Sequence, residues 1–321
     1  MSILHLCNTF FERELAGKAG NDLLAAFLQN PNFAQLQFLP YLYANEGEGL
    51  LVTEKPDTMP LPTYDLEETP PFQKVETWGY SLLAKNWADA NGLSYFMPPW
   101  DLVKMVNSKT YSFAKSPLPG ARLIYKGEPL EKKMVLKSCY KTAGSELIFS
   151  DTPEARIFCE AEWDRDLPVI AEPLVERILD FSTQWVISSG GEIAYLGATI
   201  CKTSSQGAHK SNIAGDSPPS FVEEQKAVAM EVLQEMADLG YFGEVGIDAM
   251  IYNQNQLQPI VAINARKTLG WVALMVQKRK YPKEIIELSY LPSEKTGPLP
   301  NQLGPLKFSR QITIQILDRL G

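Results

Sequence analysis

Two polar residues interrupt an apolar stretch in the C-terminal half of the chain, and together they could bind a metal ion. Asp248 lies in the run GIDAMIY, and Asn264 ends the run PIVAIN. A carboxylate and an amide oxygen are ligands that Mg²⁺ accepts, and the ion completes its shell with water and phosphate. The cations Arg266 and Lys267 follow at once, so the pattern indicates a Mg²⁺–phosphate site. The alternative is a surface hairpin with a polar end, because short hairpins are common.

Two short strands would have to position these side chains. The segments Val245–Tyr252 and Leu257–Ile263 are rich in Val, Ile, Met and Tyr, and the polar turn Asn253–Gln256 separates them. Runs of this composition around a polar turn predict a β-hairpin. Adjacent antiparallel strands can bring Asp248 and Asn264 onto the same face of the sheet.

At these residues the sequence resembles the ATP-grasp superfamily of carboxylate–amine or carboxylate–thiol ligases. The family pattern has an acid on one strand, then Glu-x-Asn with a nearby Arg on the next. Asp248, Asn264 and Arg266 match it, but Ala262 stands where the family places the first acid of Glu-x-Asn. The resemblance implies that Asp248 and Asn264 hold Mg²⁺ and that Arg266 is a catalytic residue at the γ-phosphate or the acyl phosphate. Because a methyl group supplies no ligand, a one-metal enzyme, an engineered inactivation and a natural pseudoenzyme all stay open.

Two upstream lysines match further parts of the family pattern. Lys109 closes an Asn-Ser-Lys segment, and Lys137 ends the apolar run MVLK ahead of a turn that contains Thr142, Gly144 and Ser145. The resemblance implies that both lysines and the turn bind the nucleotide phosphates. A small-residue turn lets backbone N–H groups approach phosphate oxygens, which is consistent with that role. Read without the resemblance, Lys109 is a solvated charge on a helix.

The run PVIAEPLV resembles the adenine hinge of the same family. The resemblance implies that Glu172 or a neighbouring carbonyl accepts from the adenine amino group, that the Leu174 N–H donates to the ring, and that Asp180 binds the ribose. Pro173 cannot donate to a strand ladder, so backbone groups beside it are left to face a ligand. Without the resemblance, Glu172 reads equally well as an exposed acid on an edge strand.

Several other elements follow from periodicity and composition. Residues 201–220 read as a polar loop, and the resemblance implies that it faces the second substrate or the γ-phosphate, with Lys210 as a catalytic cation. Apolar residues at helical spacing predict helices over 101–115 and 220–239. The segment Gln35–Tyr43 is expected to be a strand, and Gln311–Leu320 a short helix or strand.

Composition narrows the class of protein. The chain has 321 residues, 45% of them apolar, with 38 acidic and 30 basic residues, which give a net charge of −8. No basic run offsets this charge, which argues against a nucleic-acid-binding protein. Four scattered cysteines and two histidines do not supply a zinc cluster, a redox dithiol or a Ser–His–Asp triad. The dispersed thiols predict a cytoplasmic protein. The N-terminus lacks the basic region of a signal peptide, which agrees with this prediction. Since there is no long apolar stretch, no membrane span is expected.

The resemblance implies an α+β (α/β) protein with the ATP-grasp fold. It would comprise a small N-terminal α/β domain over residues 1–100, a lid subdomain over 101–180 and a core subdomain over 181–321, the last two clasping a nucleotide. The leading hypothesis is an enzyme that uses ATP and Mg²⁺ to join a small-molecule or peptide carboxylate to an amine, and that could form a homodimer. A non-catalytic nucleotide-binding protein and a plain interaction module are the alternatives.

Overall fold

The chain forms two compact units. The computed structural model describes residues 3–57, 59–140, 147–204, 209–216, 219–292 and 297–318. The first unit comprises Met1–Trp100, Ser211–Asp216 and Arg266–Gly321, and the second comprises Asp101–Lys210 and Ser217–Ala265.

A parallel sheet with the strand order β3-β2-β1-β4 begins the first unit. Its strands are β1 (Ile3–Leu6), β2 (Gly49–Val52), β3 (Thr63–Asp65) and β4 (Lys74–Thr77). One face packs against helices α2 (Leu23–Leu28) and α4 (Leu82–Ala90), and the other packs against α9 (Leu269–Lys280). Because both faces are covered, β2 is buried at every residue, as is usual for parallel sheets.

The expected strand at Gln35–Tyr43 is wrong, because this segment is helical. Helix α3 spans Pro31–Leu36 and the 3-10 turn η1 spans Leu39–Leu42. The side chain of Asn30 accepts a hydrogen bond from the backbone N–H of Asn32, which starts the helix. A proline in the first turn is favourable, since its missing N–H would have no helical partner there.

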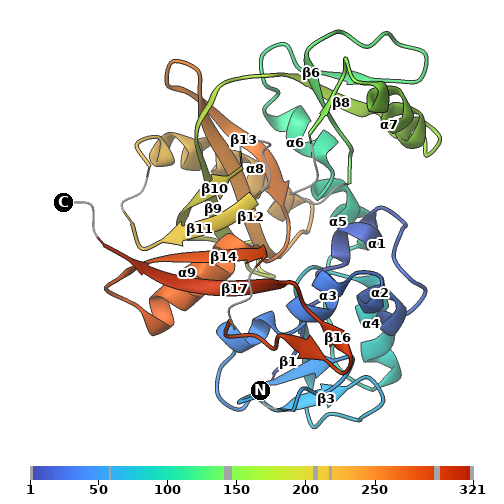
Figure 1. Cartoon of the computed structure of the whole chain (residues 1–321), viewed down its shortest axis with the longest axis vertical. Helices are drawn as coiled ribbons and strands as arrows, with labels where there is room; N and C mark the ends of the chain where they lie inside the picture. The colour runs from blue at the N-terminus through green and yellow to red at the C-terminus, as the bar shows by residue number, and fades with distance from the viewer. Residues whose placement is uncertain are drawn as a thin grey trace. The chain divides into compact units, whose positions relative to one another are not determined.

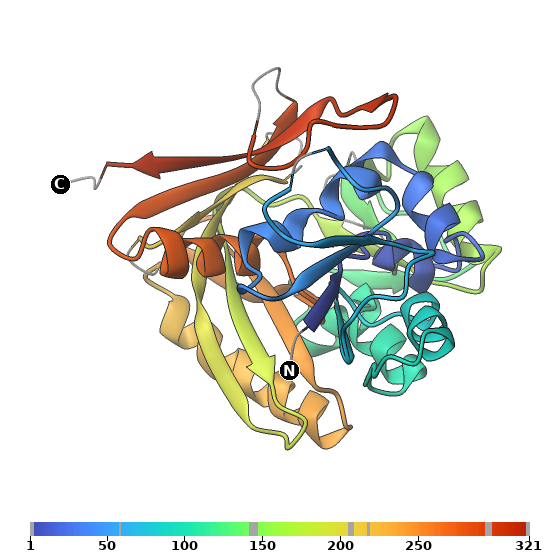
Figure 2. The ribbon, with the colours of Figure 1, turned by 90° about the horizontal axis from the view of Figure 1, so that it is seen from below.

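The C-terminal part of the first unit is an antiparallel ribbon. Strand β14 (Ile285–Pro292) pairs with β17 (Arg310–Leu317) along its length, and residues 211–214 of β11 (His209–Ala214) pair with its other edge. A small hairpin of β15 (Gln302–Leu303) and β16 (Leu306–Lys307) precedes β17. Figure 2 shows α9, in orange, beside the red β14–β17 ribbon. Of the two alternatives for the C-terminal segment, the strand is therefore the right one.

A small antiparallel sheet in the second unit carries the predicted hinge and phosphate lysine. Its order is β5-β8-β6-β7, with β5 (Arg122–Ile124), β6 (Met134–Lys137), β7 (Ile148–Phe149) and β8 (Val169–Pro173). Helix α7 (Pro153–Trp163) packs on it through a small apolar cluster, as Figure 1 shows beside β6 and β8. The run MVLK is thus strand β6, and β8 comprises Val169–Pro173 of the run PVIAEPLV.

The larger sheet of the second unit carries the predicted metal pair. Strands β13, β12, β9 and β10 neighbour one another in that order, and every pair is antiparallel. Their bounds are β9 (Arg177–Ile187), β10 (Ile193–Thr203), β12 (Gly243–Tyr252) and β13 (Gln256–Asn264). Helix α8 (Val222–Asp238), close to the predicted 220–239, covers the apolar face. The predicted hairpin is confirmed to within about two residues at each end.

Two expectations in this part of the chain were too simple. The expected loop over 201–220 is partly strand, because β10 runs to Thr203 and β11 starts at His209. The expected single helix over 101–115 is two helices, α5 (Trp100–Val106) and α6 (Lys109–Lys115). Among the described residues, no helix combines the length and apolar character needed to cross a bilayer.

Candidate functional site

Asp248 and Asn264 lie together on one face of the β12–β13 hairpin. The strand register places Gly246 opposite Asn264 and Asp248 opposite Ala262, so Asp248 and Asn264 are diagonal neighbours. The Asn264 Nδ2 donates to Asp248 Oδ2 over 2.9 Å. The two side chains that the sequence pattern paired are therefore in direct contact.

Ala262 lies directly across from Asp248, where a longer acidic side chain would face the same space. Among the described residues, no cluster of three or more His, Cys, Asp and Glu side chains could hold a metal ion. One carboxylate and one amide are nevertheless enough for Mg²⁺, which commonly uses one or two protein carboxylates and takes its other ligands from water and phosphate. In this geometry the amide nitrogen of Asn264 faces Asp248. Coordination by both residues would therefore require the amide to turn its oxygen toward the ion.

Polar residues of the neighbouring strands extend the face that carries Asp248. Ser182 of β9 is directly opposite Asp248, and Thr199 of β10 is directly opposite Ser182. Both are buried, and Gln184 Nε2 donates to Ser182 Oγ over 2.8 Å. The sequence analysis missed these residues, although period-2 alternation around Phe181 could have assigned them to the face opposite α8.

The Asn-Ser-Lys segment is held near the end of the hairpin by its own side chains. Asn107 Oδ1 accepts from the backbone N–H of Ala265 over 3.0 Å. Ser108 caps α6 by accepting from the Thr110 N–H. The backbone N–H of Lys109 donates to the carbonyl oxygen of Cys139 over 2.9 Å, two residues beyond the end of β6. These bonds bring the predicted phosphate lysine Lys109 beside both the β13 and the β6 chain ends.

Lys137 and Glu172 are the second pair of predicted residues that the structure brings together. Strands β6 and β8 run antiparallel, with Lys137 opposite Ile170 and Val135 opposite Glu172. The Lys137 Nζ lies 2.5 Å from Glu172 Oε2, and the two side chains are 21% and 19% exposed. A partly buried pair is only weakly screened by salt.

Leu174 and Asp180 follow Glu172 along the chain but lie in different environments. Leu174 follows the last residue of β8, Pro173, and is 62% exposed. Asp180 is buried on β9, where it forms an ion pair with Arg177 and accepts from Thr203 Oγ1 over 3.1 Å. The carboxylate of Asp180 therefore already has two protein partners.

The two predicted catalytic cations belong to different units. Lys210 is exposed on β11. Arg266 belongs to the first unit, where its guanidinium lies 2.6 Å from Glu12 Oε1. Thr142, Gly144 and Ser145 of the predicted phosphate turn lie outside the described residues.

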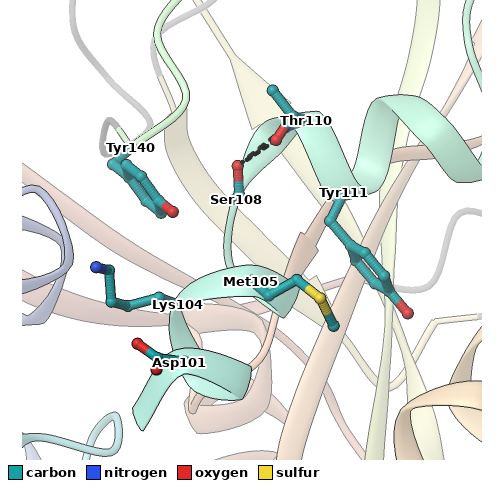
Figure 3. A pocket seen from close by; sticks show the side chains of 7 residues that line it. All are labelled: Asp101, Lys104, Met105, Ser108, Thr110, Tyr111 and Tyr140. Carbon is teal, nitrogen blue, oxygen red and sulfur yellow. Dashed lines mark hydrogen bonds between the residues drawn. The ribbon is translucent and has the colours of Figure 1, made fainter. Parts of the chain in front are cut away.

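A pocket of about 470 Å³ opens beside the cap of α6 (Figure 3). It is lined by Asp101, Lys104, Met105, Ser108, Thr110, Tyr111 and Tyr140. Ser108 and Thr110 share a hydrogen bond of 2.6 Å, and Figure 3 shows the Tyr140 ring and the Lys104 ammonium on the same side of them. Burial raises the pKa of Tyr140, against the opposing effect of a hydrogen bond with Ser108. Two residues that line this polar pocket, Ser108 and Thr110, directly precede and follow Lys109 in the sequence.

Neither a protein-family model nor a curated protein matches the sequence. Solved structures do match the fold. A protein from Archaeoglobus fulgidus described as an ATP-grasp superfamily member aligns over 99% of this chain and 100% of its own, with a TM-score of 0.57 and 15% identity. An N5-carboxyaminoimidazole ribonucleotide synthetase from Thermus thermophilus aligns over 91% of this chain and 84% of its own, with a TM-score of 0.54 and 14% identity.

An L-amino acid ligase from Bacillus licheniformis aligns over 92% of this chain and 81% of its own, with a TM-score of 0.51 and 12% identity. These three similarities cover between 91% and 99% of this chain. The chain therefore has the ATP-grasp fold.

Proposed function

We propose that the protein is an ATP-dependent ligase that joins a carboxylate to an amine. The observation that carries this proposal is the contact between Asp248 and Asn264 on adjacent strands of an ATP-grasp fold.

The residues of this chain would bind and orient the reactants. ATP, when bound with Mg²⁺, supplies the phosphoryl group that activates the carboxylate as an acyl phosphate. Asp248 and Asn264 would hold the ion, while Lys109 and Lys137 would neutralise phosphate charge. Such positioning and charge stabilisation are the main demands of phosphoryl transfer, so a chain with two histidines can meet them.

Other parts of the proposal concern recognition and organisation. Glu172 and Leu174 would contact the adenine, Asp180 the ribose, and Arg266 and Lys210 the transferred phosphoryl group. Binding to Asp180 would have to compete with its ion pair to Arg177. The chain would work as the three domains 1–100, 101–180 and 181–321. All four cysteines are free thiols, which supports a cytoplasmic location.

The test is nucleotide binding followed by turnover. Isothermal titration with Mg·ADP measures binding, and release of ADP from Mg·ATP in the presence of carboxylate and amine mixtures measures turnover. A ligand at 100 times its dissociation constant should stabilise the protein by about 2.7 kcal/mol, which a melting curve detects easily. The proposal fails if Mg·ADP neither releases heat nor raises the melting temperature.

A second function is favoured by Ala262. Its methyl group lies directly opposite Asp248, at a position where a carboxylate could have completed the metal site. A nucleotide-binding protein without ligase activity would show binding of Mg·ADP but no ADP release from Mg·ATP with any substrate mixture. Turnover by the unmodified chain would exclude this alternative.

A further inference from the structure

Helix α7 places one carboxylate inside the second unit. Its buried residues are Ala155, Cys159 and Glu162, and the first two belong to the apolar cluster that packs on the small antiparallel sheet. Residues four and three positions apart lie on the same face of a helix, so Glu162 shares this packed face. It is only 4% exposed.

Burying this carboxylate has a cost that an apolar residue would avoid. A buried charge loses its hydration, and only hydrogen bonds and partners of opposite charge offset that loss. Glu162 Oε2 accepts from the Ser138 hydroxyl over 2.9 Å, and its Oε1 lies 3.4 Å from the Arg165 guanidinium. The shorter of these two contacts joins α7 to the residue that directly follows strand β6.

The two residues after β6, Ser138 and Cys139, are held from several sides. Ser138 Oγ also accepts from the backbone N–H of Tyr140 over 3.4 Å. Cys139 is 1% exposed, and its thiol donates to the Pro168 carbonyl oxygen over 3.3 Å, just ahead of β8. The Cys139 carbonyl oxygen accepts from the Lys109 N–H over 2.9 Å. Ser138 and Cys139 are thus attached to α7, to the chain ahead of β8 and to the start of α6.

These two residues connect the two predicted phosphate lysines. Lys137 directly precedes Ser138, and the backbone of Lys109 is hydrogen-bonded to Cys139. A shift of the Ser138–Cys139 backbone would therefore change the spacing of the two lysines. The attraction between a cation and a phosphate group falls as their distance grows, so this spacing decides whether both lysines can act on one nucleotide.

We propose that Glu162 is a positioning residue of the nucleotide site. Through Ser138 it fixes the spacing of Lys109 and Lys137, and this spacing selects a nucleotide with at least two phosphate groups over a nucleoside monophosphate. The inference rests on the proposed function, since it takes both lysines as phosphate ligands. For this role Glu162 needs no contact with the nucleotide, because it acts on the backbone that carries Lys137 and binds Lys109.

The first test compares two nucleotides on the whole chain. The affinities of ADP and AMP, both with magnesium present, are measured for the wild type and for Glu162→Met by competition with a fluorescent ADP analogue. Methionine has a similar size but cannot accept the Ser138 hydrogen bond. The ratio of ADP to AMP affinity should fall about tenfold in the variant, equivalent to about 1.4 kcal/mol. A purely structural role would lower both affinities equally and leave the ratio unchanged.

Two further variants of α7 are the controls. Glu162→Gln keeps a side-chain oxygen that can accept from Ser138, so its affinity ratio should stay close to that of the wild type. Glu160→Met removes an exposed carboxylate from the same helix, where it pairs with Arg156 over 2.9 Å, and should leave the ratio unchanged. A ratio that falls as far in Glu162→Gln as in Glu162→Met would overturn the proposal, because the charge and not the hydrogen bond would then be responsible.

A double-mutant cycle tests whether Glu162 acts through Ser138. Ser138→Ala should lower the ratio as Glu162→Met does, and the double variant should be no worse than the worse single variant, because both changes remove the same hydrogen bond. Losses that add would show that the two residues act independently, which refutes the proposal. Circular dichroism and melting curves establish that the variants are folded, and Ser138→Ala carries the test alone if Glu162→Met does not fold.

The outcomes separate this inference from the proposed function. If the wild type binds neither ADP nor AMP, the proposed function is refuted and the positioning role with it. If the wild type binds ADP more tightly than AMP but Glu162→Met and Ser138→Ala keep the same affinity ratio, the positioning role alone is refuted.

Discussion

Without ligands, the Ala262→Glu variant should be less stable than the parent protein. With magnesium and nucleotide added, the variant should become the more stable of the two. Residue 262 is directly opposite Asp248 in the antiparallel register, where Cβ atoms of paired residues lie about 5 Å apart. Without metal, the new carboxylate would face an existing one. Like charges at such positions destabilise a sheet, by up to about 1 kcal/mol. For a chain of this size that corresponds to a fall in melting temperature of roughly 2 °C.

With Mg²⁺ and ADP bound, the same two carboxylates would both be able to act as ligands of the cation. The repulsion is then replaced by attraction to the ion, so Ala262→Glu should gain more stabilisation from Mg·ADP than the parent does. The assay is a set of melting curves with and without Mg·ADP, together with ADP release from Mg·ATP. Ala262→Gln is the matched control, because it has nearly the same size without the charge. It should show neither the loss nor the larger gain.

One result would refute the reasoning about this site. If Mg·ADP stabilises the parent, Ala262→Glu and Ala262→Gln equally, no metal ion binds beside Asp248. If Ala262→Glu also acquires ADP release that the parent lacks, the parent is a nucleotide-binding protein that has lost one metal ligand.

Three further predictions concern other parts of the structure. Lys137→Met should weaken Mg·ADP binding at least tenfold in titration calorimetry, because it removes a phosphate-neutralising charge and leaves Glu172 without its 2.5 Å partner; a variant that binds as well as the wild type would exclude Lys137 from the nucleotide site. Burial lowers the pKa of His5 below its ordinary 6.5, against the raising effect of its hydrogen bond with Glu48. The folded state therefore resists a proton that the unfolded state accepts, so the melting temperature should fall as the pH drops below about 6.5, and His5→Gln should lose this pH dependence. Ser108→Ala should lower stability by about 1 kcal/mol through loss of the α6 cap, and Ser108→Gly by less; equal melting temperatures for Ser108→Ala and the wild type would contradict the capping role.

The local elements of the site could be predicted because neighbouring residues determine them. The β12–β13 hairpin has alternating apolar residues around a polar turn, and its two strands pair through that turn. The contact between Asp248 and Asn264 follows from this local pairing. The failure at Gln35–Tyr43 was local as well, since α3, which Asn30 caps, ends at Leu36 and the 3-10 turn η1 follows at Leu39–Leu42.

The sequence by itself therefore determined the hairpin, the strands that carry Lys137 and Glu172, and the likeness to a ligase fold. Only the tertiary structure decided which distant residues meet. Lys137 meets Glu172 across an antiparallel strand pair, and Arg266 meets Glu12, a residue more than two hundred positions away. Periodicity reports which face of its own element a side chain occupies, but not which other element packs there. Such partners depend on how the whole chain closes its loops and buries its apolar surface.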